Sequence, residues 1–503
     1  MFVVTTVNRS LPMAREDDSW RWVVAIAAFL TQFIVCGITY SLGIFHVVFK
    51  DTFYESHFET SWVGSILLYV TALSSIMFRF VTSRFGSRVS VILGGLLAST
   101  GLGLCMLAQE LFHLYLCFGL LTGLGFGLAC SPSIVAVERY FVHGRSQALS
   151  VVVAGIGAGI ITFPVLIRQL LLHFAWRGTM LILSGIALNL CVCGMVMKPL
   201  RHEKQIPLRS MLSCIPLQHP LFDGMCLANL FWSFGSTVVY MYLPSYAMAQ
   251  GSSFDSAVFL VSTVGMASFA SRAIFAFMGP NSTLDEVTST LCSLGLGVVI
   301  LGIAPLLFKN YMGQVAYTLL FGFYSGFWTT FLSQASRELL GPRYVAMGNG
   351  YLSLMVALGA LCGGPLTGLL LYQENDFKVA FYLGGACLLW SSVVMILLKL
   401  QRCQPRLEDF HPEKTSNATN KTKGLPGKGD DFSVPLITGE MKNGGGGSGN
   451  SILMSTVVSG PGESVGGTSL TSRNGRAGYQ APPNTGSTVI NSNDIVVWVP
   501  KDF

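Results

Sequence analysis

Charged residues are scarce over most of this sequence. Asp, Glu, Lys and Arg make up 11% of its 503 residues, whereas soluble domains have about 25%. Only 37 of the first 400 residues are charged, against 19 of the last 103. Such a chain is not a soluble enzyme, a nucleic-acid-binding protein or a secreted disulfide-rich protein. The net charge of +6 adds little, because a few basic residues at membrane edges account for it.

Long apolar runs fill the charge-poor part of the chain. A helix needs roughly 20 apolar residues to cross a hydrocarbon core of about 30 Å. Twelve runs meet this requirement: residues 22–48, 61–82, 89–108, 113–137, 148–172, 178–198, 222–246, 257–278, 288–308, 314–336, 346–372 and 379–399. They predict an all-α membrane protein with 12 transmembrane helices.

A proline-containing segment separates the sixth run from the seventh. It includes Pro207, Pro216 and Pro220, and such a segment is typical of a linker. A six-plus-six arrangement predicts two helix bundles around a central path. The expected domains are a cytoplasmic N-terminal segment (1–21), an N-terminal six-helix bundle (22–198), a cytoplasmic linker (199–221), a C-terminal six-helix bundle (222–400) and a cytoplasmic tail (401–503).

The tail differs in composition from the rest of the chain. It contains a GGGGSG run at 444–449 and few aromatic residues. A segment of this kind cannot bury enough apolar surface to offset the entropy lost on ordering. We therefore expect residues 401–503 to be disordered.

Basic residues predict the orientation in the membrane, since loops rich in Lys and Arg stay cytoplasmic. With the N-terminus inside, the inner segments hold fourteen Lys and Arg residues. The outer loops hold four, namely Lys50, Arg177, Lys309 and Lys378. None of the twelve cysteines falls in an outer loop, so no disulfide framework is expected. We expect a multi-pass protein of the plasma membrane with both termini cytoplasmic.

Arg272 is the ionisable residue that lies deepest in a predicted span. It is about fifteen residues into the run 257–278, where a charge is costly and usually functional. A guanidinium grips a carboxylate through two parallel hydrogen bonds, so Arg272 is a candidate anchor for an anionic group. Arg168 and His46 lie near the outer ends of their spans, which favours an interfacial or helix-end role. No Asp or Glu occupies the middle of any span.

Aromatic and polar residues in three spans supply a candidate path for a small organic molecule. The expected substrate-binding residues beside Arg272 are Tyr40, Ser41, Asn229, Trp232, Phe323, Tyr324 and Trp328. The spans contain no paired carboxylates, no Ser, His and Asp constellation and no metal-ligand cluster. We therefore expect no catalytic residues, no metal, no cofactor and no nucleic-acid partner.

Short motifs in the first half resemble those of the major facilitator superfamily. The segment Ser83–Arg88 resembles its loop signature after the second span, with Ser83 where that signature usually has Asp. Twelve spans with a central linker fit the fold of that superfamily. The resemblance implies that the loop and the helices near it take part in conformational change. The gating residues implied in this way are Arg84, Gly86, Arg88, Arg145 and Gly155.

A narrower resemblance is to the monocarboxylate transporter family. Residues 16–22, with Trp20 and Trp22, resemble the motif before its first span, although Asp18, Ser19 and Arg21 replace its three glycines. Residues 139–155 resemble its second motif, and the match covers roughly residues 16–400. The amino-acid sequence of the third, fourth and sixth spans most resembles that of the creatine-transporting member of the family.

Three departures from the family pattern affect its proton-handling groups. The family pairs an Asp with an Arg four residues later in its eighth span, and here Ser268 precedes Arg272. The family's lysine of the first span falls on Gly43, and an acidic residue of its tenth span falls on Gln334. The resemblance thus implies a carboxylate anchor, while the departures argue against proton coupling.

We therefore expect an alternating-access transporter of a small monocarboxylate or a related organic acid, not necessarily proton-coupled. A creatine or amino-acid facilitator is an alternative. A second alternative is a non-transporting membrane sensor that uses the cytoplasmic tail as its output. The resemblance also implies a single-span immunoglobulin-like chaperone as a partner, beside the substrate and membrane lipid.

Overall fold

The computed structural model describes residues 18–141, 145–197, 220–278, 310–374 and 376–400, together with four short strands in the tail. Helices make up nearly all of the first five ranges. In the N-terminal half they are α1 (Asp18–Tyr40), α2 (Leu42–Phe53), α3 (His57–Cys105), α4 (Leu111–Leu114), the π-helix η1 (Tyr115–Thr122), α5 (Gly123–Tyr140) and α6 (Arg145–Val196). In the C-terminal half they are α8 (Pro220–Ala249), α9 (Phe254–Met278), α11 (Tyr311–Glu374) and α12 (Phe377–Leu400).

Several helices contain two of the predicted spans. The second and third spans lie in α3, which is broken at Gly86 (φ 85°, ψ 161°). The fifth and sixth lie in α6, which is broken at Ala175 (φ 52°, ψ −178°). The tenth and eleventh lie in α11. A positive φ costs glycine little because it has no Cβ, so the predicted gating residue Gly86 is where the chain bends between two spans.

The described helices are those of a membrane protein. Eight helical stretches among the described residues are long and apolar enough to cross a membrane. Large apolar side chains such as Leu107, Leu172 and Trp390 are exposed, as a surface that faces lipid requires. The predicted ninth span, 288–308, and the predicted linker, 199–221, lie almost wholly outside the described residues.

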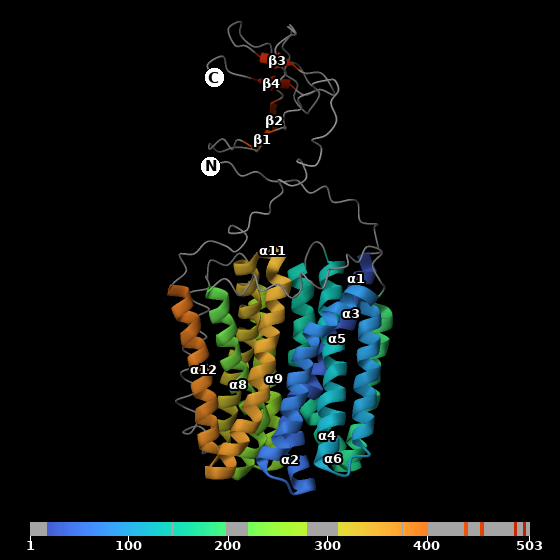
Figure 1. Cartoon of the computed structure of the whole chain (residues 1–503), viewed down its shortest axis with the longest axis vertical. Helices are drawn as coiled ribbons and strands as arrows, with labels where there is room; N and C mark the ends of the chain where they lie inside the picture. Colours follow the sequence, from blue (N-terminus) through green and yellow to red (C-terminus); the bar gives the residue numbers. More distant parts are fainter. Residues whose placement is uncertain are drawn as a thin grey trace, which may run out of the picture. The chain divides into compact units, whose positions relative to one another are not determined.

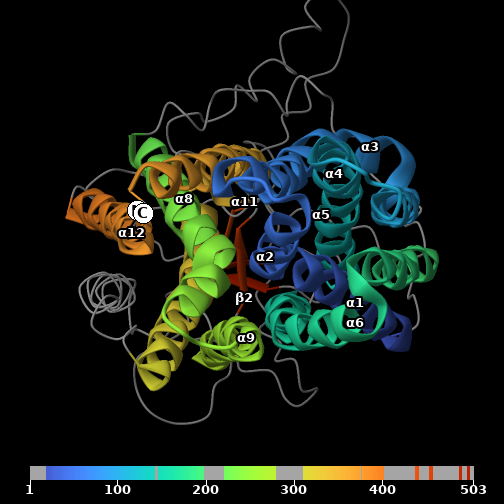
Figure 2. The same cartoon turned by 90° about the horizontal axis from the view of Figure 1, so that it is seen from below.

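The helices up to residue 400 run side by side as two bundles that share a long boundary (Figure 1). Figure 2 shows α1, α2, α5 and α6 on one side and α8, α9 and α12 on the other, with α2 beside α8. Each bundle has its own apolar core. Small residues bring helices into close contact, since a Cβ on Gly125 of α5 would lie 2.3 Å from the backbone nitrogen of Ala98 on α3.

The tail forms a separate unit that begins at Glu413. Its described strands are β1 (Ile437–Glu440), β2 (Leu453–Thr456), β3 (Ser487–Val489) and β4 (Val496–Trp498). β1 pairs with β2 and β3 with β4, both antiparallel. Disorder of the tail was expected, and these strands are the part of it that the structure describes.

Candidate functional site

Arg272 lies on α9, and its side chain is 8% exposed. Its Nη2 donates to Thr329 Oγ1 on α11 at 3.4 Å. Its Nε and Nη1 have no hydrogen-bond partner among the described residues. A buried guanidinium with two unpaired donors is costly unless an anion accepts from them. The geometry therefore leaves two donors of Arg272 for a negatively charged ligand.

Two tyrosines from different bundles lie beside this guanidinium. Tyr40 is the last residue of α1 and Tyr240 lies on α8, and their rings are 4.6 Å apart at 49°. The Tyr240 and Tyr40 phenols and the Cys36 thiol are the titratable groups that act on Arg272. No carboxylate is among these groups in the described part of the chain. The site is thus shared between the bundles and lacks an acidic partner.

A polar stripe on α1 continues away from Tyr40. Gln32, Cys36 and Tyr40 are four residues apart, so they lie on one face of the helix. Gln32 Nε2 donates to Cys130 O at 3.1 Å and to Ser133 Oγ at 3.2 Å on α5. Its Oε1 accepts from the thiols of Cys130 at 3.2 Å and Cys36 at 3.8 Å. These contacts fix Gln32 and join α1 to α5 beside the boundary between the bundles.

The site residues expected from the sequence did not include Gln32, Cys36, Tyr240 and Thr329. An amide in the middle of an apolar run is a visible signal, so Gln32 could have been chosen. Tyr240 and Thr329 carry no such signal, because a tyrosine or threonine in a membrane helix is common in helix packing. Only the packing of α1, α8, α9 and α11 brings them to Arg272.

The predicted residues Ser41, Asn229 and Phe323 lie in other surroundings. Ser41 is fully buried and donates to Gly37 O of the preceding turn at 2.7 Å. Asn229 on α8 donates to Leu352 O on α11 at 3.0 Å. Phe323 on α11 is half-buried. The hydrogen bond of Ser41 therefore stabilises a helical turn, and that of Asn229 joins two helices.

The predicted aromatic residues of the C-terminal bundle pack on one another. Trp232 and Trp328 stack with ring centres 6.3 Å apart at 12°. Tyr324 lies 6.2 Å from Trp328, and its hydroxyl shares a hydrogen bond with Ser392 of α12 at 3.3 Å. The structure thus brings Tyr40 together with Arg272, whereas these three rings lie in the core of their own bundle.

The predicted gating residues occupy bends and close helix contacts. Gly86 forms the break in α3, and Arg88 follows it with an exposed side chain. A Cβ on Gly155 of α6 would lie 2.5 Å from Phe29 O on α1, so only glycine lets these helices approach. The remaining two side chains of this set, which the structure does not describe, are those of Arg84 and Arg145.

The positions that depart from the family pattern are packed against backbone or lack a partner. Ser268 is fully buried one turn before Arg272, and its Oγ has no partner among the described residues. A Cβ on Gly43 would lie 2.5 Å from Tyr240 O, so this position has no room for a side chain. The side chain of Gln334 lies outside the described residues.

The other two ionisable candidates are engaged at one end of the bundles. Arg168 on α6 pairs with Asp255 on α9 and lies over the ring of Phe254. His46 on α2 shares a hydrogen bond with His57 on α3. Among the described residues, no group of three or more His, Cys, Asp or Glu side chains could hold a metal ion.

Comparison with known proteins identifies the fold and the family. The family model of the Major Facilitator Superfamily matches residues 24–339. Monocarboxylate transporter 13 of Bos taurus is 30% identical over 427 residues, which cover 84% of this chain and 96% of the relative. Monocarboxylate transporter 12 of Homo sapiens is 29% identical over 430 residues, which cover 78% and 83%.

A crystal structure of a bacterial homolog of the human lysosomal transporter Spinster has a similar fold. Its TM-score is 0.54 at 14% identity, and the match covers 76% of this chain and 96% of the homolog. The predicted all-α fold with membrane-spanning helices is therefore confirmed. By the family match and the relatives together, the chain belongs to the monocarboxylate transporter family of the major facilitator superfamily, and it is a multi-pass membrane transporter rather than an enzyme.

Proposed function

We propose that this protein carries a small organic carboxylate across the plasma membrane by alternating access. The observation that supports this best is Arg272, which is buried and has Nε and Nη1 without partners among the described residues. Each of these donors can give a charge-assisted hydrogen bond to a carboxylate oxygen. In our proposal the substrate supplies the acceptors that the described residues do not.

The position of the site supports alternating access. Tyr40 belongs to the N-terminal bundle, whereas Tyr240 and Arg272 belong to the C-terminal bundle. A substrate held among the three contacts both bundles, as in carriers whose two halves rock around a central site. Its release then requires only that the bundles separate on one side of the membrane.

The surroundings of Arg272 favour transport that is not coupled to protons. A proton-coupled carrier needs a buried group that titrates near the substrate. Ser268 stands one turn before Arg272 where the family has Asp, and no carboxylate acts on Arg272 among the described residues. We therefore propose facilitated diffusion or exchange.

Among candidate substrates, acids without a positive charge fit this site better than zwitterions. A cationic group needs a carboxylate or an open aromatic face. Trp232 and Trp328 pack against each other and are both buried, at 7% and 1% exposure, so neither offers an open face. Lactate-like and pyruvate-like acids are therefore our first candidates, and creatine or an amino acid is the alternative.

The test is uptake of radiolabelled lactate, pyruvate, creatine and aromatic amino acids into proteoliposomes that contain the full-length protein. Arg272→Ala removes both donors and is expected to abolish uptake of the substrate. Arg272→Lys keeps the charge without the guanidinium donors and is expected to raise KM at least about tenfold, since a charge-assisted hydrogen bond contributes about 1.5–3 kcal/mol.

Arg168→Gln is the matched control, because Arg168 is also an arginine in a predicted span but is paired with Asp255. We expect its KM to stay within about twofold of the unaltered protein, since the Asp255 side chain is 69% exposed and exposed ion pairs contribute only about 0.2–1 kcal/mol. Unchanged uptake in Arg272→Ala would refute the anchor. Accumulation driven by an imposed pH gradient would refute the uncoupled mechanism.

The plasma membrane and the single-span immunoglobulin-like chaperone remain proposals that rest on family resemblance. Co-expression tests the chaperone directly. If the partner is required, surface labelling of this transporter should rise when such a glycoprotein is expressed with it, and it should not change with an unrelated single-span protein.

A further inference from the structure

The two bundles meet tightly along α2 and at the start of α3. A Cβ on Gly43 of α2 would touch Tyr240 O on α8, and a Cβ on Gly368 of α11 would lie 2.9 Å from His57 O on α3. α2 lies beside α8 at this end (Figure 2). The predicted orientation places it at the outer face. A carrier that opens outward must break these contacts.

A chain of three basic side chains lies in this interface. Lys50 Nζ is 2.9 Å from His57 Nε2, and His57 Nδ1 is 3.1 Å from His46 Nε2. Lys50 and His46 lie one turn apart on α2. His57 begins α3, where Ser56 and Glu59 form a capping box that fixes the start of the helix. The three side chains are therefore held by two rigid helix ends.

The hydrogen bonds determine which nitrogen carries each proton. An ammonium only donates, so His57 Nε2 accepts from Lys50. His57 Nδ1–H then donates to His46 Nε2, and His46 carries its proton on Nδ1. This arrangement requires both imidazoles to be neutral. One added proton turns an acceptor in the chain into a donor and breaks a hydrogen bond.

The pair also touches the opposite bundle. The His46 ring meets the edge of Tyr242 on α8 at 5.1 Å and 76°, and the His57 ring meets Phe377 of α12 at 5.4 Å and 86°. The Tyr242 hydroxyl donates to Gly364 O on α11 at 2.8 Å. The two histidines thus lie between the N-terminal helices and three helices of the C-terminal bundle.

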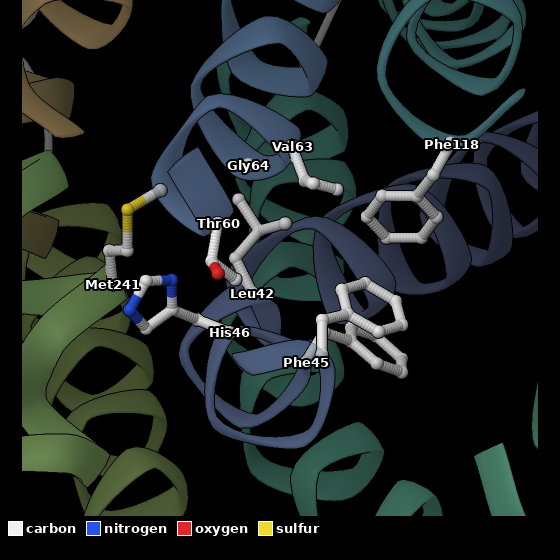
Figure 3. A pocket seen from close by; sticks show the side chains of 9 residues that line it. Leu42, Phe45, His46, Thr60, Val63, Gly64, Phe118 and Met241 are labelled. Atoms are coloured by element: carbon white, nitrogen blue, oxygen red, sulfur yellow. The ribbon is translucent and has the colours of Figure 1, made fainter. Parts of the chain in front are cut away.

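A small cavity adjoins His46 (Figure 3). His46, Thr60 and Met241 line it, together with apolar side chains of α2, α3 and η1. His46 Nδ1 and Thr60 Oγ1 are buried and have no partner among the described residues. The cavity volume of about 10 Å³ is close to the space that one water needs. A water there would accept from His46 Nδ1–H and bind Thr60.

No carboxylate stabilises a positive charge on these histidines within the described residues. Lys50 acts on both histidines, and His57 also acts on His46. Glu55 and Glu59, near the start of α3, interact with each other and with Ser56. The other titratable groups on the facing elements are Tyr242 and Tyr246 of α8 and the Asp376–Lys378 pair at the start of α12.

We propose that Lys50, His57 and His46 form a proton-responsive latch, which holds the outer ends of the bundles together at neutral pH and releases them when the histidine pair takes up a proton. A proton on either histidine adds a second positive charge beside Lys50. The like charges repel, and the lost hydrogen bond no longer holds the rings against Tyr242 and Phe377. Burial and Lys50 lower the pKa of His57 to about 4 while this end is closed. Opening hydrates the pair and returns it toward the ordinary imidazole pKa of about 6.5, so protonation below that pH favours the open state.

The latch rests on the proposed transport function but differs from proton coupling. The proton binds from the outer side and leaves to the same side, so it changes the rate of opening and not the equilibrium distribution of substrate. The second contact between the bundles at this end is the Arg168–Asp255 ion pair, which contains no imidazole. The pH response is therefore assigned to the histidines.

The test measures opening directly on the full chain in cells. Ser65 on α3 is fully buried against Gly364 of α11, about two turns from His57. Ser65→Cys is labelled from outside with a membrane-impermeant thiol reagent at pH 7.5 and 5.5. The rate is divided by that of Tyr54→Cys, a position that is 92% exposed. The ratio removes the pH dependence of thiol chemistry.

We expect the labelling ratio to rise at least about fivefold at pH 5.5, within the limit of about 100-fold for one linked proton over two pH units. The double variant His46→Gln, His57→Gln should lose the response. Lys50→Met should keep it and move its midpoint to higher pH, because the opposing charge is gone.

A ratio that does not change with pH in the Ser65→Cys protein overturns the latch, and so does a response that survives in the double variant. If the double variant does not reach the surface, the midpoint in Lys50→Met decides, and an unshifted midpoint overturns the latch. Uptake is measured separately. If the labelling ratio does not respond to pH but uptake still depends on Arg272, only the latch is overturned. If the labelling ratio responds to pH but no substrate is taken up, the proposed transport function is overturned.

Discussion

Arg272 is the side chain on which the proposed binding of a carboxylate depends most. Its Nη2 is satisfied by Thr329, and its Nε and Nη1 are left for a ligand. Tyr40 and Tyr240 lie on either side of the boundary between the bundles and act on the same guanidinium. Their hydroxyls are neutral donors beside the proposed carboxylate, so they are expected to add to binding without adding charge.

Tyr240→Phe tests this role at the scale of one hydroxyl. We expect KM for the carried acid to rise about fivefold, since a neutral hydrogen bond contributes about 1 kcal/mol. The Tyr240 hydroxyl shares a 3.3 Å hydrogen bond with Ser325. Tyr324→Phe is the matched control, because its hydroxyl shares a hydrogen bond of the same length with Ser392 inside the C-terminal bundle. Equal KM values for the two variants would place Tyr240 outside the site.

The helices α2 and α8 decide how the outer end closes. Gly43 lies where the family has a lysine, and its missing side chain lets α2 reach the backbone of α8. A neighbouring ion pair, Arg168–Asp255, joins α6 to α9. The closed end is therefore held by backbone packing, by one ion pair and by the histidine latch.

Gly43→Ala is expected to loosen this end. The added Cβ would lie 2.5 Å from Tyr240 O, and overpacking of this kind costs about 1–3 kcal/mol. External labelling of Ser65→Cys at pH 7.5 should rise in the Gly43→Ala background. Gly185→Ala, with nothing within 4 Å of the new Cβ, should leave labelling unchanged. Identical labelling in both backgrounds would contradict the assigned role of α2.

The whole molecule consists of a helical unit that ends at Pro412 and a tail unit that follows it. The proposed site draws its residues from α1, α8, α9 and α11, all within the helical unit. This arrangement favours a carrier over a sensor that signals through its tail, because the residues that would bind the substrate do not include the tail.

A chain that ends after Leu400 separates these two functions. We expect its uptake, normalised to the amount at the surface, to match that of the full chain, with KM unchanged. A truncated protein that reaches the surface and no longer transports would show that the tail takes part in the carrier cycle. If neither chain transports any of the tested acids, the sensor becomes the better interpretation.

The sequence determined the class of this protein and its most important side chain. Twelve apolar runs and 37 charges in 400 residues specify membrane helices, because lipid excludes unpaired charge and open backbone. The isolation of Arg272 in one of these runs was visible for the same reason. Partners across helices were not visible, since a periodic pattern indicates which residues lie inside a helix but not which neighbour they meet.

Only the tertiary structure decided which polar groups share a site. It turned Trp232, Tyr324 and Trp328 toward one another and brought Tyr240 and Thr329 to Arg272. It also placed His46 beside His57, eleven residues away in the sequence and on another helix. Contacts between helices depend on side-chain shape and on close approach at glycine. The packing of the helices therefore decides which side chains meet.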